Sequence, residues 1–258
     1  MVLLGGSLLG NDTRAAIEQL HGAAPEAALL VLGHQEHESE NVLAVRSGAQ
    51  DYLIKGHTDP ELMRRALQHG IERKYQERKL AYLAHHDPLT QLANRVAFGE
   101  RLELCVQAGR QGGARCAVMF LDLDGFKQVN DTHGHEAGDT VLCEISRRIQ
   151  ASVREEDVVA RLGGDEFGVL LCEVADSAIA ARVAQRILDI TGVPVLLRDE
   201  LEVSVRASLG VALYPESGQS PDALLRADDS AMYAAKAKGG GYLLHSAETE
   251  AETKQRAG

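Results

Sequence analysis

Two groups of carboxylates lie where apolar segments of this chain end, and their positions could support chemistry on a phosphate. Asp122 and Asp124 close the apolar run VMFLDLD, and we place their side chains on opposite faces of a strand. Asp165 and Glu166 follow a glycine pair between the apolar arms of VVARLGGDEFGVLL, a pattern that predicts a β-hairpin. Because oxygen donors suit hard cations, the two groups together predict a site for metal-assisted phosphoryl transfer.

Each group also has a simpler interpretation. Asp122 fits a solvated strand-to-helix turn in which an aspartate serves as cap, and this alternative stays open. A hairpin accounts for Gly163 and Gly164, yet Asn-Gly or Asp-Gly is the usual order and no turn rule requires Asp-Glu before Phe167. Glycines also allow a ligand to approach the backbone closely, which favours the functional interpretation.

The elements that must position these residues follow from the hydrophobic pattern. A boundary is expected at Asp87-Pro88, since the residue before a proline is pushed out of the helical region. Beyond it we expect an α+β domain with a mostly antiparallel central sheet flanked by helices. The expected helices are 94–108, 126–131, 139–153, 177–191 and 221–236, and the expected strands are 115–122, 158–162, 167–173, 193–197, 201–214 and 242–245.

The chain before this boundary shows a different order of elements. Strands at 2–4, 28–32 and 51–54 alternate with helices at 11–22 and 39–47, which is the βαβαβ alternation of an α/β fold. A long helix follows, with one apolar stripe that suits a connecting or dimerising helix. We therefore divide the chain into a segment 1–59, a linker helix 60–85, a second domain 86–246 and a tail 247–258 expected to be disordered.

Composition limits the possible partners. The 258 residues include 27 Lys and Arg against 38 Asp and Glu, a net charge of −11, which argues against a general nucleic-acid or membrane-surface binder. Residues 1–80 hold 9 basic and 11 acidic side chains, which leaves 18 and 27, or −9, in the remainder, so a polyphosphate ligand there would need divalent cations. No apolar run is long enough to span a membrane, and we expect a cytoplasmic protein.

Cysteine spacing indicates no metal site. The four cysteines are dispersed along apolar segments and none forms a CxxC pair, so we expect reduced, structural thiols rather than disulfides or zinc ligands. They are Cys105, Cys116, Cys143 and Cys172.

Five separated motifs point to one family. The pentapeptide GGDEF stands at 163–167, and around it lie HDPLTQLANRVAF, FLDLDGFKQVNDTHGHEAGD, SLGVALYP and ADDSAMYAAKAKGG. In order and spacing the chain from about Ala84 to His245 resembles the GGDEF family, the diguanylate cyclases. The resemblance implies the GGDEF nucleotidyl-cyclase-like fold, and an enzyme that condenses two GTP into cyclic di-3′,5′-GMP and two pyrophosphates. It also implies Mg²⁺ or Mn²⁺ and a homodimer formed through the linker helix and the GGDEF domains.

The resemblance assigns roles position by position. Asp122 and Asp165 would bind the metal ions with help from the backbone carbonyl of Leu123. Glu166 would either contact the metal or accept the proton of the 3′-hydroxyl group. These three carboxylates are the expected catalytic residues.

Substrate contacts are implied in the same way. Asn130 and Asp139 match the pair that reads the guanine edge, where a carboxylate accepts the two donors on N1 and N2. Gly163 and Gly164 would let the nucleotide pass over the hairpin. Lys127 and Lys236 match lysines that contact phosphate. Where the family usually has an arginine, four residues after Lys236, this chain has Gly240, so its grip on the triphosphate would be weaker unless Lys238 substitutes.

Arg154 and Asp157 match the family's RxxD motif for inhibition by the product, at the expected spacing from the hairpin. Arginine suits guanine and phosphate through paired hydrogen bonds, and Arg182 or Arg186 are candidates for a second guanidinium group. The alternative is an ordinary charged helix end, with a cation near the helix C-terminus.

The N-terminal segment resembles the second half of a response-regulator receiver domain, with Lys55 at the receiver lysine. Gly5 stands where the phosphoacceptor aspartate belongs, and Gly33 where the switch Ser or Thr should follow a strand. We therefore expect no phosphorylation control, and interpret the segment as a truncated receiver or a dimer scaffold.

Two classes of function remain. The first is the cyclase, a metal-dependent enzyme with GTP as substrate and cyclic di-GMP as product and inhibitor. The alternative is a catalytically silent binding module for cyclic di-GMP or GTP. The intact Asp122, Asp165 and Glu166 favour the enzyme, whereas Gly240 and the broken receiver favour the module mildly. A phosphorylation-dependent response regulator is weakened by Gly5.

Overall fold

The computed structural model describes residues 1–5, 12–34, 38–198 and 201–246. The chain forms two compact units, Met1–Tyr82 and Leu83–Gly258, and each is described by itself. No helix among the described residues is both long enough and apolar enough to cross a membrane. The expected tail at 247–258 lies outside the described residues.

The first unit is built on a small parallel sheet of order β1-β2-β3. Its central strand consists of apolar residues and is buried, as expected for a strand covered on both faces. Gly5 is the last residue of the first strand and Gly33 the last of the second. The elements are β1 (Val2–Gly5), α1 (Thr13–Ala23), β2 (Leu29–Gly33), α2 (Glu38–Arg46), β3 (Asp51–Ile54) and α3 (Pro60–His85).

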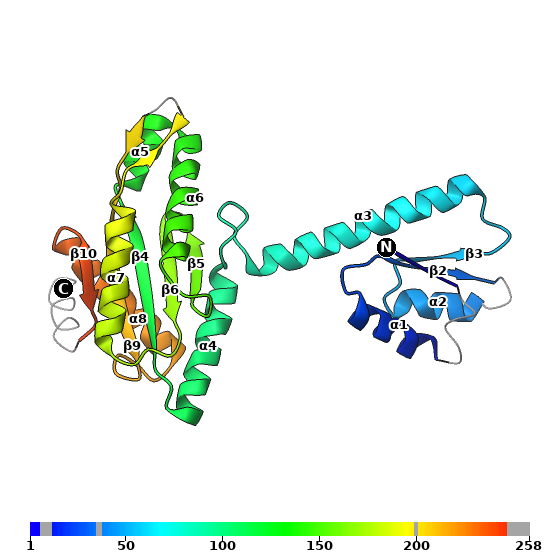
Figure 1. Ribbon diagram of the computed structural model, residues 1–258, viewed down its shortest axis with the longest axis horizontal. Helices are drawn as coiled ribbons and strands as arrows, with labels where there is room; N and C mark the ends of the chain where they lie inside the picture. Colours follow the sequence, from blue (N-terminus) through cyan, green and yellow to red (C-terminus); the bar gives the residue numbers. More distant parts are fainter. Residues whose placement is uncertain (6–11, 35–37, 199–200, 247–258) are drawn as a thin grey trace. The chain divides into compact units, whose positions relative to one another are not determined.

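The second unit is built on a mixed five-stranded sheet of order β10-β9-β4-β6-β5 (Figure 1). All pairs are antiparallel except β10 with β9, so the predicted mostly antiparallel sheet is confirmed. A separate two-stranded ribbon pairs β7 with β8. The strands are β4 (Cys116–Asp124), β5 (Val158–Gly163), β6 (Glu166–Leu171), β7 (Val195–Leu196), β8 (Glu202–Val203), β9 (Arg206–Tyr214) and β10 (Gly241–Leu244).

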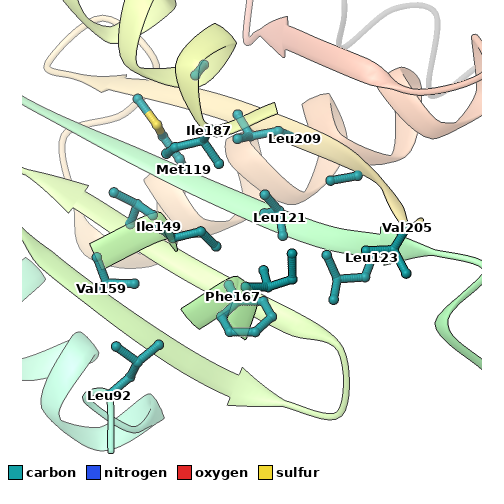
Figure 2. Packing of buried hydrophobic residues seen from close by; sticks show 14 of the residues in the cluster. Leu92, Met119, Leu121, Leu123, Ile149, Val159, Phe167, Ile187, Val205 and Leu209 are labelled. Carbon is teal, nitrogen blue, oxygen red and sulfur yellow. The ribbon is translucent and has the colours of Figure 1, made fainter. Parts of the chain in front are cut away.

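Helices cover both faces of this sheet. Alternate residues of β4, such as Met119 and Leu121, pack with α5, α6 and α7 in one apolar cluster, part of which Figure 2 shows. The intervening residues, such as Val118, pack with α4 and α8 in a second cluster. The central strand is therefore buried on both sides until it reaches its carboxylates. The helices are α4 (Arg95–Gly112), α5 (Phe126–His133), α6 (His135–Ala151), α7 (Ser177–Thr191) and α8 (Pro221–Ala237).

Local capping sets the helix starts. The side chains of Asn94, Asp176 and Ser220 accept hydrogen bonds from the third following backbone amide, which satisfies donors that a helix N-terminus leaves open. Helix α6 begins at His135, four residues before the expected position, directly after Gly134 at φ 83°. The apolar pattern misses this first turn because its first two residues, His135 and Glu136, are polar and exposed.

The expected single strand over 201–214 is wrong. Residues 202–203 pair with β7 in the small ribbon, whereas 206–214 pair with β4 and β10 in the main sheet. Val203 and Val205 are both buried, so the apolar pattern continues across the break and conceals it.

Candidate active site

Asp122 and Asp124 lie on one face of the sheet, not on opposite faces. They are two residues apart in β4, and side chains at that spacing share a face; the expectation of opposite faces is wrong. Asp122 stands directly opposite Glu166 of β6 and Ser208 of β9. The Ser208 hydroxyl donates to the carboxylate of Asp124 at 3.0 Å. The edge of the sheet thus gathers carboxylates from two strands.

The hairpin that carries the other carboxylates is held in a conformation that favours glycine. Gly163 and Gly164 have φ values of 146° and 55°, a region in which residues with a Cβ are strained. The backbone amide of Leu123 donates to the carbonyl of Asp165 at 3.3 Å. This bond joins the hairpin tip to the end of β4 and places Asp165 beside Asp122.

An ion pair between Arg161 and Asp87 supports the hairpin. Arg161 donates from Nε and Nη2 to the carbonyl of Gly164, at 3.0 and 2.9 Å, and from Nη1 to Asp87 at 3.2 Å. Asp87 also accepts from the backbone and hydroxyl of Thr90. Burial opposes ionisation of Asp87, but these hydrogen bonds outweigh it and lower the pKa of its carboxyl group.

Cations already balance part of the negative charge. Lys236 on α8 donates to Oδ1 of Asp122 at 2.6 Å, which raises the pKa of the lysine. Arg95 on α4 donates to Glu166 at 3.3 Å and to the carbonyl of Leu162 at 3.1 Å. Burial raises the pKa of Asp165, and the charge of Asp122 raises it further. Lys236 and Arg161 act in the opposite direction and lower it.

The donor set fits a hard divalent cation. Asp122 and Asp165 supply carboxylate oxygens next to a backbone carbonyl at Leu123, and these oxygen donors are the ones that hard cations prefer. Among the described residues, no group of three or more His, Cys, Asp or Glu is arranged as a metal cage. The ammonium group of Lys236 supplies the positive charge beside Asp122.

The two residues expected to read a base lie on neighbouring helices. Asn130 is on α5 and Asp139 on α6, next to Gly138. A Cβ atom at Gly138 would lie 1.9 Å from Oδ1 of Asn130, so only glycine permits the two helices to approach this closely. The carboxylate of Asp139 is exposed to solvent, and so is Lys127 in the first turn of α5.

Two cavities adjoin these residues. One of about 300 Å³ lies beside Glu166 and is lined by Arg95 and by Asp229 of α8. Another of about 1080 Å³ lies between α6 and the β7–β8 ribbon and includes Asp139. Asp122 lines neither of these two cavities.

Gly240 occupies the place where the resemblance leads us to expect an arginine. A Cβ atom there would lie 3.5 Å from Oδ2 of Asp124, which places the position at the carboxylate edge. A side chain at this position would therefore start beside the carboxylate of Asp124.

A separate cavity of about 490 Å³ holds the expected inhibition motif. Arg154 and Asp157 line it together with Arg182 and Arg186 of α7. Asp157 accepts from the backbone amide of Arg154 at 3.0 Å, and Arg186 donates to the carbonyl of Ser152. Both arginines that we named as candidates for a second guanidinium group face the same cavity as Arg154.

Some residues of the site were not singled out from the sequence. Arg161, Asp87 and Arg95 fix the hairpin, and Ser208 fixes Asp124. A signal existed for Asp87 and Arg161, since both lie inside or beside the quoted motifs, but the pairing joins residues 74 apart in the chain. A motif that is read locally does not reveal such a pair.

Fold and site together define a mixed α/β domain with an acidic, glycine-lined hairpin at the sheet edge, a class suited to nucleotides and divalent cations. The sequence profile of "Diguanylate cyclase, GGDEF domain" matches residues 84–241. The chain therefore belongs to the GGDEF family.

Known relatives agree with this assignment. The chain is 48% identical over 157 residues to the diguanylate cyclase TpbB of Pseudomonas aeruginosa, a match that covers 61% of this chain and 36% of TpbB. A solved structure of the TpbB GGDEF domain is 44% identical with a TM-score of 0.64, covering 66% of this chain and 99% of that one. The coiled coil and GGDEF domain of DgcB from Caulobacter crescentus, solved in complex with c-di-GMP, is 28% identical with a TM-score of 0.61, covering 72% of this chain and 97% of that one. The chain thus spans about a third of the length of TpbB.

Proposed function

We propose that this chain is a diguanylate cyclase, which condenses two GTP into cyclic di-3′,5′-GMP and two pyrophosphates. The observation that carries the proposal is the convergence of Asp122, Asp165 and Glu166 at one edge of the sheet, in a chain of the GGDEF family. The diguanylate cyclase TpbB at 48% identity supports it. The roles of the individual residues and the choice of Mg²⁺ or Mn²⁺ are parts of the same proposal.

The carboxylates hold the reacting groups. Asp122, Asp165 and the carbonyl of Leu123 would bind the divalent cation, and Glu166 would join them or accept the 3′-hydroxyl proton. When bound, the metal ion supplies a Lewis acid that lowers the pKa of the hydroxyl group and stabilises the leaving pyrophosphate. Lys236, now paired with Asp122, is placed to move its charge onto a substrate phosphate once a cation neutralises that carboxylate.

The helices α5 and α6 select the base. The exposed carboxylate of Asp139 accepts from the two donors that guanine presents at N1 and N2, and adenine offers no equivalent pair. Asn130, held against Gly138, contributes both a donor and an acceptor to the same edge. Lys127, in the first turn of α5, would contact a phosphate of the same nucleotide.

Two copies of the domain are needed for one product. Each holds one GTP, and each 3′-hydroxyl group attacks the α-phosphorus of the other nucleotide with release of pyrophosphate. We propose a homodimer that forms through α3 and the GGDEF domains. Cyclic di-GMP would then bind in the cavity of Arg154, Asp157, Arg182 and Arg186, whose guanidinium groups suit phosphate and guanine, and inhibit the enzyme.

The test is incubation of the full chain with GTP and Mg²⁺ at increasing protein concentration, with products separated by chromatography. We expect cyclic di-GMP and pyrophosphate in a 1:2 ratio from the parent, and no cyclic product from Glu166→Gln. Glu103→Gln, which changes an exposed carboxylate on α4, is the matched control and should keep full activity. Equal activity of the parent and Glu166→Gln would contradict the assigned role of Glu166.

A second candidate function is a silent binding module, and Gly240 at the carboxylate edge favours it because one phosphate contact is missing. The same experiment separates the two candidates. A parent that makes no product at any protein concentration, but binds cyclic di-GMP and loses that binding in Arg154→Ala, is a receptor on a cyclase fold.

A further inference from the structure

Two cysteines far apart in the sequence meet on the side of the domain away from the carboxylate edge. Cys105 on α4 and Cys172, which follows the last residue of β6, lie with their sulfur atoms 3.4 Å apart, although 67 positions separate them. A disulfide bond needs about 2.05 Å between the same atoms, so each sulfur has to move by less than about 1 Å. From the sequence, both residues are expected to be reduced, structural thiols.

The surroundings of the four cysteines differ in ways that matter for oxidation. Cys105 and Cys172 are each partly exposed, so a small oxidant can reach them. Cys116 lies close by but is buried, and burial raises the pKa of its thiol to about 12. Cys143 is exposed on α6, where its thiol donates to the carbonyl of Leu89. Only Cys105 and Cys172 combine access with a thiol partner.

Within the pair the roles are unequal. The hydrogen bond that the two sulfur atoms share favours the thiolate of Cys105 and lowers its pKa, against the effect of burial, and the charge of Arg101 adds to the lowering. The same hydrogen bond raises the pKa of Cys172. Since the thiolate is the nucleophile, Cys105 is the sulfur that attacks and Cys172 the one that resolves.

We propose that Cys105 and Cys172 form a redox modification site, which a peroxide converts into a reversible disulfide. The Cys105 thiolate attacks one peroxide oxygen and breaks the O–O bond, which gives a sulfenic acid and, after protonation, water or an alcohol. The Cys172 sulfur then attacks the sulfenic sulfur, loses its proton and displaces water. Two thiols lose two electrons and two protons in total, and the peroxide takes up both.

The modification site adjoins the arginine cavity. Cys172 itself lines the cavity of Arg154 and Arg182, and its backbone amide donates to Oδ1 of Asp157 at 3.0 Å. A disulfide would tie this backbone to α4 through Cys105. The chemistry does not depend on the proposed function, because it needs only the two sulfurs and the oxidant.

The test uses the full chain, purified under reducing conditions and freed of reductant, then treated with hydrogen peroxide at one to five equivalents. Remaining thiols are alkylated, the chain is digested without reduction, and the peptides are identified by mass spectrometry. We expect one linked pair joining Cys105 to Cys172, two hydrogen atoms lighter than the separate peptides and released by dithiothreitol. Cys143→Ser, the matched control for an exposed thiol, should form the same pair to the same extent.

Two variants separate this result from a general sensitivity to oxidation. In Cys172→Ser, Cys105 should stop at the sulfenic acid, trapped by a dimedone probe, and in Cys105→Ser, Cys172 should stay alkylatable. Circular dichroism confirms that each variant is folded. Full alkylation of both cysteines after peroxide treatment of the parent, or a linked pair that includes Cys116 or Cys143, would overturn the proposal.

Discussion

The carboxylate edge and the arginine cavity lie on the same domain but have opposite charge. At the edge, Asp122 pairs with Lys236 and Glu166 with Arg95, and burial raises the pKa of Asp165 although Lys236 and Arg161 oppose the shift. The cavity is lined by three arginines, Arg154, Arg182 and Arg186, and by two carboxylates, Asp157 and Glu173. On the proposed function, the first surface would need cations before it receives a phosphate, whereas the second would receive one directly.

This difference in charge indicates which of the two surfaces could bind a nucleotide without a metal ion. On a chain of net charge −11, an anionic ligand is repelled unless positive charge is local. We therefore expect binding at the edge to require divalent cations and binding at the cavity to be independent of them. Substitutions at the two surfaces and in the elements that support them test this contrast.

Asp165→Asn should impair the carboxylate edge and leave the arginine cavity intact, because it removes a proposed metal ligand from the edge. Loss of residues that only support a ligand already costs about 10- to 100-fold, so we expect turnover of GTP to fall by at least about 100-fold. Isothermal titration with cyclic di-GMP in EDTA should show unchanged binding at the cavity. Weakened binding there would mean that the two sites are not electrostatically separate.

Arg154→Ala should have the complementary effect. A hydrogen bond to a charged group contributes about 1.5–3 kcal/mol, so the inhibition constant for cyclic di-GMP should rise by roughly 10- to 100-fold, with the initial rate unchanged. Progress curves at fixed GTP measure both quantities. Arg147→Ala, an exposed arginine of α6, is the control and should be inhibited like the parent; equal inhibition of Arg154→Ala would contradict the assignment of the cavity.

Asp87→Asn should loosen the hairpin without touching a metal ligand. It removes the ionic partner of Arg161, so we expect a loss of about 1–3 kcal/mol in the free energy of unfolding and a smaller loss of turnover than in Asp165→Asn. Because the folded state lowers the pKa of Asp87, its contribution is present above the pKa of the unfolded chain and disappears as the pH falls through the folded pKa. Urea unfolding between pH 3 and 7 should show a flatter profile for the variant.

Asp228→Ala should have the smallest effect and the opposite sign. The Asp228 carboxyl group of α8 is fully buried, and burial raises its pKa well above the ordinary value, although a hydrogen bond from the backbone of Phe120 acts in the opposite direction. Ionising it costs free energy, so stability should fall as the pH rises above about 4, by up to about 1.4 kcal/mol per unit. The variant should be about 1 kcal/mol more stable than the parent near pH 7 and should lose this advantage in acid; a parent profile that does not fall with pH would contradict this account.

The sequence was most informative where chemistry is local. The apolar runs of β4 and β6 and the GGDEF pentapeptide predicted the sheet and the hairpin, because each depends on neighbours in the chain. The sequence did not reveal the pairs Arg161–Asp87 and Cys105–Cys172, which are 74 and 67 positions apart and meet only through the topology. The break between β8 and β9 was missed for a different reason, since buried valines on both sides keep the apolar pattern intact.

Three consecutive glycines at the start of β10 limit which residues could replace Gly240. Gly239, Gly240 and Gly241 have φ values of 94°, 103° and 98°, all in the region that strains a residue with a Cβ. A Cβ at Gly240 has enough space, since it would lie 3.5 Å from Oδ2 of Asp124. The φ angle of Gly240, however, is unfavourable for any residue with a Cβ. An arginine restored there would have to rebuild the turn as well as supply a charge. Replacing the whole turn should therefore introduce a positive charge at the carboxylate edge more readily than any single substitution does.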